Sequence, residues 1–368
     1  MVSSPAPKSS DATTSGNASS AATSSANHSP VHPVKTTAAQ TSPSQPAKTS
    51  TNGTSAPKLR AGATTVSWVS ACGQRLCVNG TPWRLTMGSI NGKSDPADAV
   101  RRAKDLGLNA IRLTDFLDKH ASPATGPYDA SRWADVDKVI AASGAAGLHV
   151  ELDLATYRNL LATSGVNPYT ADWRPFLDFV VNRRNSVTRI RYGDDPTIAL
   201  VSFAGEVEPI NSATNTRQVT TQQLTDFYRG VLAYWSAAAP RQLLSAGGLM
   251  HLGWNSGIDW KAIFALPHND VIALHLYSDS DRQKVVPAVA AYGAQLGRPW
   301  ITEEFGFLSS MGDAVRAAKF AGTYQLNRAH GSAGTGFWNL GPQTSNTHDV
   351  GPQFPAASAA VRREASTP

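Results

Sequence analysis

The sequence of 368 residues predicts an α/β fold: a (β/α)8 TIM barrel with a short N-terminal β-hairpin and a disordered N-terminal tail. Three observations lead to this prediction. The composition changes sharply near Arg60; beyond it, short β-rich runs alternate with longer helical patterns; and reactive side chains collect where the β-rich runs end. Alternating strands and helices favour a parallel sheet, and eight such units over about 300 residues match the size of a closed barrel.

Residues 1–60 are predicted to form a disordered tail or linker, and residues 61–368 the barrel domain. The tail is rich in Ser, Thr, Ala and Pro and contains no Phe, Tyr or Trp, whereas all nine Trp residues follow it. A segment of this composition cannot bury enough apolar surface to offset the entropy that ordering would cost. We expect a solubilising linker, or a stalk that carries O-linked sugars or spans a wall.

The net charge of +6 is concentrated in the tail. Its charged residues are Lys8, Lys35, Lys48, Lys58, Arg60 and a single acid, Asp11, so the tail carries +4 and the remainder +2. A nearly balanced domain gives little support for binding nucleic acid. No apolar run reaches the ~18 residues of a membrane span, so we expect neither a nucleic-acid partner nor a span.

The two cysteines, Cys72 and Cys77, have four residues between them. This spacing suits a disulfide across a β-turn, and two free thiols are the alternative. A metal site would need further ligands close by, so we expect neither a metal nor another cofactor. The predicted hairpin covers residues 74–82, with Asn79-Gly80 as its turn.

We expect a secreted or cell-wall-associated protein. Residues 1–10 lack an apolar signal core, so this expectation implies either that a signal has been removed or that export follows another route.

Eight β-rich runs are the predicted barrel strands: residues 83–90, 109–114, 148–154, 197–204, 242–248, 270–277, 299–304 and 334–340. Between them lie helical patterns such as residues 95–107, 131–147, 220–239 and 312–331. These patterns begin near Asp, Ser or Thr and mostly end at Gly, as helix capping requires.

The C-terminal ends of five predicted strands carry reactive side chains. They are Arg112 on the second, Glu206 and Glu208 after the fourth, His275 and Tyr277 on the sixth, Glu303 and Glu304 on the seventh, and Trp338 and Asn339 on the eighth. In this fold the chemistry takes place at that end of the barrel. The fourth and seventh strands lie on opposite sides of the mouth, so their carboxylates can face each other across a sugar, as hydrolysis of a glycosidic bond requires.

Several segments resemble clan A glycoside hydrolases, especially family 5, which includes endo-β-1,4-mannanases and cellulases. The motifs are YGDDPTIALVSFAGEVEP (192–209) with the preceding VVNRRNSVTRI (180–190), GRPWITEEFG (297–306), DVIALHLYSD (270–279), GLNAIRL (107–113) and GFWNL (336–340). They occur in the family's order and cover almost the whole predicted barrel. The resemblance implies a retaining glycoside hydrolase that cleaves O-glycosidic bonds of a polysaccharide or oligosaccharide by double displacement, in the manner of a β-mannanase. We expect a monomer.

The resemblance also assigns roles. Counted from Pro196, the family's acid/base falls on Glu206, and the Glu before Phe305-Gly306 makes Glu304 the nucleophile. The implied substrate-site residues are Arg112, His275, Tyr277 and Trp338, of which Trp338 is the sugar platform. We expect the two carboxyl groups to lie about 5–5.5 Å apart, with Arg112 and Tyr277 hydrogen-bonded to Glu304.

Two further expectations concern the neighbouring carboxyl groups. The negative charge opposite Glu206 should raise its pKa. Strand alternation predicts that Glu303 points away from the barrel axis if Glu304 points toward it.

The sequence departs from the family pattern beside the acid/base. Gly205 stands where the family has Asn, which predicts a gap beside the sugar C2, and Val207 stands where it has Pro. Shifting the register by two residues makes Glu208 the alternative catalyst. The strand-three Asn and the Trp after the H-x-Y segment do not reappear. Two alternatives therefore stay open: a clan A hydrolase for another glycan, either β-glucan or a furanoside such as arabinan, and a catalytically degenerate glycan-binding barrel.

Overall fold

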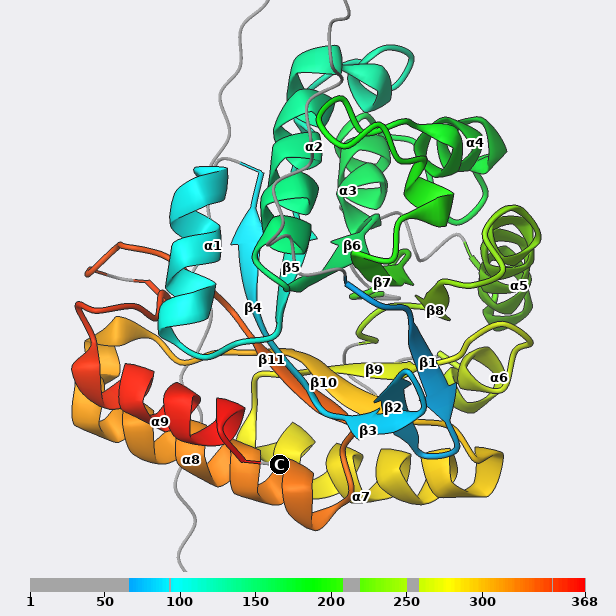
Figure 1. The fold of residues 1–368 in the computed structure, drawn as a ribbon. Helices are drawn as coiled ribbons and strands as arrows, with labels where there is room; N and C mark the ends of the chain where they lie inside the picture. The colour runs from blue at the N-terminus through cyan, green and yellow to red at the C-terminus, as the bar shows by residue number, and fades with distance from the viewer. Residues whose placement is uncertain (1–65, 93, 208–218, 250–257, 346, 368) are drawn as a thin grey trace, which may run out of the picture. The chain divides into compact units, whose positions relative to one another are not determined.

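The computed structural model describes residues 66–92, 94–207, 219–249, 258–345 and 347–367. The predicted tail and Glu208 lie outside the described residues. Eight parallel strands form the central sheet: β4 (Leu85–Asn91), β5 (Ala110–Thr114), β6 (His149–Asp153), β7 (Ile198–Ser202), β8 (Leu243–Ser245), β9 (Ile272–Leu276), β10 (Trp300–Phe305) and β11 (Gly334–Phe337). Each coincides with a predicted strand (Figure 1).

The sheet curves into a barrel. Its hydrogen-bonded order is β8-β7-β6-β5-β4-β11-β10-β9, so β4 pairs with β11. The strands at the two ends of this order, β8 and β9, approach each other, and a parallel bridge joins Leu249 to Leu274. The backbone N–H groups of Asp270 and Val271 also donate to the carbonyl of Leu244. The predicted (β/α)8 barrel is confirmed.

Helices follow the strands on the outside of the barrel (Figure 1). They are α1 (Pro96–Asp105), α2 (Ala130–Ala145), α3 (Ala155–Thr163), α4 (Arg174–Asn182), α5 (Thr221–Ala238), α6 (Trp260–Phe264), α7 (Asp279–Leu296), α8 (Asp313–Ala329) and α9 (Pro355–Ala365). Asp95 caps α1 ahead of a proline, and Thr220 forms a capping box with Gln223 at α5. None of the helices that the structure describes is long and apolar enough to cross a bilayer.

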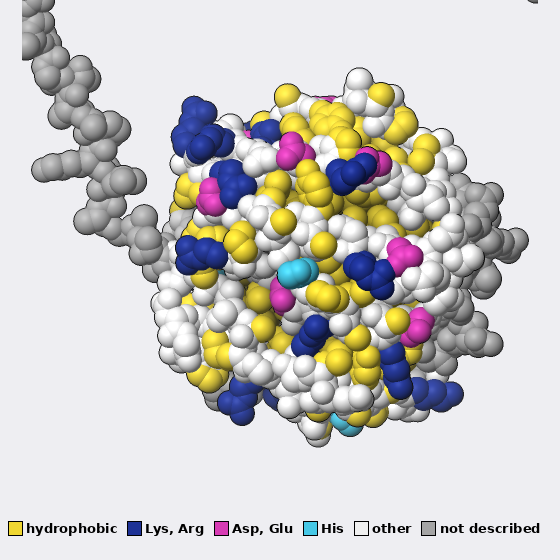
Figure 2. All heavy atoms as spheres, turned by 90° about the vertical axis from the view of Figure 1, so that its right-hand side faces the viewer, with side chains coloured by type: hydrophobic (Ala, Val, Ile, Leu, Met, Phe, Trp, Pro, Cys, Tyr) yellow, Lys and Arg dark blue, Asp and Glu magenta, His cyan; other side chains and the backbone are white. Residues whose placement is uncertain are grey.

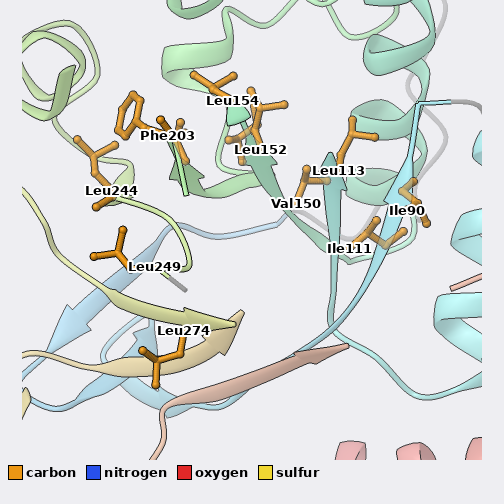
Figure 3. Close-up of a cluster of buried hydrophobic side chains, with 14 of the residues drawn as sticks. Ile90, Ile111, Leu113, Val150, Leu152, Leu154, Phe203, Leu244, Leu249 and Leu274 are labelled. Carbon is orange, nitrogen blue, oxygen red and sulfur yellow. The ribbon is translucent and has the colours of Figure 1, made fainter. Parts of the chain in front are cut away.

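Alternation along the strands separates two environments. Ile90, Ile111, Leu113, Val150 and Leu152 are buried on the helix side of the sheet (Figure 3). The residues between them face the barrel interior, where the side chains are apolar at the N-terminal end and polar at the C-terminal end. Each strand therefore holds the helices with one face and builds the interior with the other.

A small antiparallel sheet packs against the N-terminal end of the barrel. It consists of β1 (Val69–Cys72), β2 (Arg75–Val78) and β3 (Thr81–Trp83). Asn79 and Gly80 turn between β2 and β3 with left-handed φ values of 51° and 76°, as the predicted hairpin requires. The sequence did not predict β1. Val69 and Leu76 join Leu85, Ala110 and their neighbours in one apolar cluster.

Cys72 and Cys77 form a disulfide between β1 and β2, with their Cα atoms 6.1 Å apart. The predicted bridge is confirmed. On the face of the molecule in Figure 2, Lys and Arg side chains are interspersed with Asp and Glu side chains. That face therefore has no broad patch of one charge.

Candidate active site

A cavity of about 240 Å³ opens at the C-terminal ends of the strands. Its lining includes five of the six predicted site residues: Arg112, Glu206, His275, Glu304 and Trp338. The sixth, Tyr277, follows β9 and reaches Glu304 with its hydroxyl. The structure thus brings together side chains that are far apart in the sequence: Arg112 and Trp338 are separated by 226 positions.

Glu304 lies one residue before the end of β10, and both of its carboxylate oxygens have hydrogen-bond partners. Arg112 donates to Oε2 from Nη1, and the Tyr277 hydroxyl donates to Oε1. Both predicted contacts are present. Burial and the adjacent Glu304 raise the pKa of Tyr277 far above its usual value, so the phenol keeps its proton and remains a donor. Glu304 is thereby fixed as an oriented anion.

Arg112 lies at the centre of a cluster of carboxyl groups that the sequence prediction largely missed. Its Nη2 donates to Asp153 Oδ2 at 2.6 Å and lies 3.8 Å from Glu303 Oε2, while its Nε lies 3.9 Å from Glu151 Oε1. Burial lowers the pKa of Arg112, but the carboxylates of Asp153 and Glu304 outweigh this effect and raise it. Arg112 therefore remains charged.

Glu151 and Asp153 were detectable in the sequence. They lie two residues apart in the third predicted strand, so alternation places both on the same face of β6, the face toward the barrel interior. An apolar core offers no counter-charge for two acids, so a pair of acids at the C-terminal end of a buried strand indicates a functional site. Thr114 and the backbone N–H of Ala155 also donate to Asp153.

Glu206 follows β7 in an unusual backbone conformation. Its φ is 57°, in the left-handed region that a non-glycine residue seldom adopts. Its backbone N–H donates to the carbonyl of Gly248 at 2.8 Å, which holds this conformation in place. The side chain is 36% exposed, and its Oε1 lies 2.7 Å from His275 Nδ1. Strained residues of this kind cluster at functional sites.

The expectation of a raised pKa for Glu206 is wrong. Burial does raise it, but the hydrogen bond and positive charge of His275, with Arg158 at 4.0 Å and Arg112, lower it to about 2. The same carboxylates act on His275. Burial lowers its pKa, yet Glu304, Glu206 and Glu303 together raise it to about 10. Both pKa shifts favour an ionised Glu206 beside a protonated His275.

Glu206 and Glu304 approach closely. One oxygen of each carboxyl group, together with a ring nitrogen of His275, lies within 4.8 Å of the others. Retaining glycosidases place their carboxyl groups about 5–5.5 Å apart and inverting ones about 6.5–9.5 Å. The separation fits the retaining arrangement.

The same three residues offer the donor set of a possible cation site. Glu304, however, already accepts from Arg112 and Tyr277 on both oxygens, and the permanent charge of Arg112 opposes a second cation there. The geometry favours a pair of opposed carboxyl groups over a metal centre.

Glu303 points into the site, contrary to the prediction from alternation. A β-bulge between Thr302 and Glu304 shifts the register of β10 against β9, so that two successive side chains face the interior. Glu303 is 1% exposed, and its Oε2 accepts from Gly248 N at 2.8 Å and contacts His275 Nε2 at 2.7 Å. It belongs to the site together with Glu304.

Gly205 does not leave the predicted gap. A Cβ at this position would come within 2.9 Å of Gly248 N and 3.2 Å of Gly247 C. The backbone of residues 247–248 fills the place where the family's Asn side chain was expected. Trp338 follows β11 and lines the cavity, and its peptide bond to Asn339 is cis.

Comparison with known proteins agrees with this geometry. Residues 76–344 match the family model described as cellulase, glycosyl hydrolase family 5. The chain is 24% identical over 338 residues to a protein named putative mannan endo-1,4-beta-mannosidase 9 of Oryza sativa subsp. japonica, covering 73% of this chain and 80% of the relative. A second rice protein, named mannan endo-1,4-beta-mannosidase 2, is 23% identical over 347 residues, or 75% and 76% of the two chains.

Solved structures share the fold. The endo-1,4-beta-mannanase from Rhizomucor miehei superposes with a TM-score of 0.69 at 20% identity, covering 82% of this chain and 100% of that one. The catalytic domain of the major endoglucanase from Xanthomonas campestris pv. campestris gives 0.55 at 17% identity, with the same coverage. The match of the family model over most of the barrel carries the assignment: the chain belongs to glycosyl hydrolase family 5, a family of retaining glycoside hydrolases.

Proposed function

We propose that this protein cleaves a β-mannan-like polysaccharide or oligosaccharide, with Glu304 as nucleophile and Glu206 as acid/base. The observation that carries the roles is the opposed pair: Glu304 is held by Arg112 and Tyr277, and Glu206 faces it with carboxyl oxygens within 4.8 Å. The substrate proposal is supported by the names of the two rice relatives.

The geometry accounts for both steps of double displacement. Glu304, ionised and oriented, attacks the anomeric carbon while Glu206 gives a proton to the glycosidic oxygen. In the second step Glu206 takes a proton from water, and the hydroxide displaces Glu304 from the sugar. Arg112 and Tyr277 bind the nucleophile before attack, so little reorganisation is needed. Trp338 lines the cavity and offers an aromatic face to the C–H side of the sugar.

A β-glucan substrate is the second candidate. The matching family model is described as cellulase, and the Xanthomonas endoglucanase shares the fold. The purified protein should be tested on β-mannan, β-glucan, xylan and arabinan with sizing of the products. Release of short mannooligosaccharides at least tenfold faster than products of the other glycans supports the proposal, and a preference for any other glycan contradicts it.

The role of Glu206 has a separate test. Glu206→Gln should lower turnover of the polysaccharide by about 10²–10⁴-fold. It should largely spare the glycosylation step with a 2,4-dinitrophenyl glycoside, whose leaving group needs no proton. Equal losses on both substrates, with the selective pattern appearing in Glu208→Gln, would move the role to Glu208.

We also propose that residues 61–368 act as the catalytic domain without residues 1–60, and that the protein is a secreted or cell-wall-associated monomer. The composition of the tail supports the first point, and the Cys72–Cys77 disulfide is typical of an oxidising compartment.

A further inference from the structure

A buried chain of acidic and imidazole groups continues from Glu206 into the barrel. His275 Nδ1 lies 2.7 Å from Glu206 Oε1, and His275 Nε2 lies 2.7 Å from Glu303 Oε2. A neutral imidazole has one N–H, so between two ionised carboxylates it would leave one of these contacts without a hydrogen. An imidazolium donates to both carboxylates. The two contacts therefore require a second proton on this group of three residues, and the acids around His275, Glu304 at 4.0 Å among them, favour the imidazole as its site.

The chain continues beyond Glu303. Glu151 is adjacent to Glu303, and each residue is 1% exposed. Glu303 Oε1 and Glu151 Oε2 are both buried, and neither accepts from a donor of the described residues. A proton on one of these two acids would let it donate to the other, whereas two adjacent buried carboxylates would repel each other.

The surroundings place this proton on Glu151. Burial and the adjacent Glu303 raise the pKa of Glu151 well above its usual value. Burial also raises the pKa of Glu303, but Arg112 and His275 outweigh it and lower the pKa. Glu151 Oε1 accepts from the Ser202 hydroxyl at 2.8 Å, which leaves Oε2 to carry the proton.

We propose that Glu151, Glu303 and His275 form a proton relay behind Glu206, in which the imidazolium of His275 stores the proton that Glu206 delivers to the leaving group. The inference rests on the proposed acid role of Glu206. His275 and the two buried acids are positioning residues, since they act through Glu206.

The proton balance is complete over one turnover. The Nδ1 proton of His275 passes to Glu206, which gives a proton to the glycosidic oxygen. The imidazole is then neutral and retains its Nε2 proton, with which it donates to Glu303. In the second step Glu206 takes a proton from water and returns it to Nδ1. One proton leaves with the sugar alcohol and one enters from water.

Other charges surround the relay. Among the described residues, the charged groups near His275 or its two carboxylate partners include Glu304 at 4.0 Å from Nδ1, Arg112, Asp153 and Arg158, and the phenol of Tyr277 contacts Glu304. Arg112 and Arg158 supply two permanent positive charges against the ionised acids. The excess of acids explains why protons remain on His275 and Glu151.

The first test observes the stored proton directly. In ¹⁵N-histidine-labelled protein, His275 should show two protonated ring nitrogens at about pH 8, where an ordinary histidine is neutral. The His275→Gln variant identifies its signals. His149 serves as an internal reference: burial lowers its pKa, so its ring should be neutral in the same spectrum. A neutral His275 in the wild-type protein would overturn the relay.

The second test compares the charge of Glu303 with the hydrogen bond that Glu151 donates to it. Glu303→Gln removes the anion that holds the imidazolium, so the alkaline limb of kcat/KM on soluble galactomannan should move down by one pH unit or more. Glu151→Ala removes a neutral donor from Glu303 and leaves a more basic carboxylate beside the imidazolium, so the limb should move up, whereas Glu151→Gln, which still donates to Glu303, should restore most of the wild-type profile. An unchanged alkaline limb in Glu303→Gln, or no rescue by Gln at position 151, contradicts the relay.

The proposed function can fail separately. If His275 is an imidazolium but Glu206→Gln shows no selectivity between galactomannan and a 2,4-dinitrophenyl mannoside, the stored proton is real and the acid role of Glu206 is wrong. If the selectivity is present and His275 is neutral, the acid role stands and the relay fails.

Discussion

The two ends of the barrel interior are built from the same strands but hold opposite kinds of side chain. On β5, Ala110 belongs to the apolar cluster at the N-terminal end, whereas Arg112, two residues on, is surrounded by carboxylates. On β10 the same change occurs between Ile301 and Glu303. Apolar burial stabilises one end, and the other end concentrates charges that oppose folding unless they are paired. The fold and the chemistry therefore depend on different residues of the same strands.

Replacing the nucleophile should give the largest effect on activity. Glu304→Gln should lower turnover on the polysaccharide and on activated glycosides alike, on the order of 10⁴-fold or more, because no covalent glycosyl-enzyme can form. The matched control is Glu364→Gln, which breaks the buried ion pair with Arg84 at 2.9 Å; neither residue lines the cavity. That variant should lose stability and keep its kcat. Measurable turnover in Glu304→Gln, or loss of kcat in the control, would remove the distinction between the two kinds of carboxylate.

A cavity made at the apolar N-terminal end of the barrel should lower stability and leave activity unchanged, the reverse of the result expected for Glu304→Gln. Leu76 is 3% exposed and joins the small sheet to the strand starts. Leu76→Ala should lower the free energy of unfolding by about 2–5 kcal/mol, measured by denaturant titration. Its kcat/KM below the unfolding transition should not change. Val187→Ala, at a side chain that is 58% exposed, should cost less than about 0.5 kcal/mol. If Leu76→Ala alters kcat/KM, the two ends are coupled.

The sequence was sufficient for the strands and for most of the site, for a physical reason. Strands buried on both faces read as short apolar runs, and charged residues in such runs have no place in a core, so Arg112, His275 and Glu304 were identifiable. Glu303 was misplaced because a bulge breaks alternation without any local signature in the sequence. The space beside Gly205 was misjudged because residues 247–248 reach it from another loop, which only the three-dimensional structure reveals.

A methyl group at Gly205 tests the packing between these two loops. Gly205→Ala places a Cβ within 2.9 Å of Gly248 N, so the backbone must shift, at a cost of about 1–3 kcal/mol. The shift should also lower kcat, because Glu206 is the next residue. Gly230→Ala in α5 meets nothing within 4 Å and should stabilise the helix by up to about 1 kcal/mol. Thermal unfolding and kcat of both variants decide the point, and a Gly205→Ala enzyme with wild-type kcat would show that the site tolerates the movement.

The last contrast is a difference in sign between two histidines, one at each end of the barrel. The pKa of His275 is raised to about 10, so its contribution to stability is fully present below the unfolded value of about 6.5 and is lost as the pH rises through about 10. At the other end, burial lowers the pKa of His149, whose ring contacts Trp83. Its contribution is present above about pH 6.5 and is lost as the pH falls through the folded value.

The free energy of unfolding, measured by urea titration across the pH range, should therefore respond to each histidine on a different side of neutrality. A single group changes the slope by at most about 1.4 kcal/mol per pH unit. Replacing His275 by Gln should flatten the profile between about pH 6.5 and 10, whereas His149→Gln should flatten it just below pH 6.5, above the acidic range in which Glu206 titrates. Both variants flattening the same side would contradict the contrast, since it would mean that the apolar end and the charged end impose the same protonation preference on a buried imidazole.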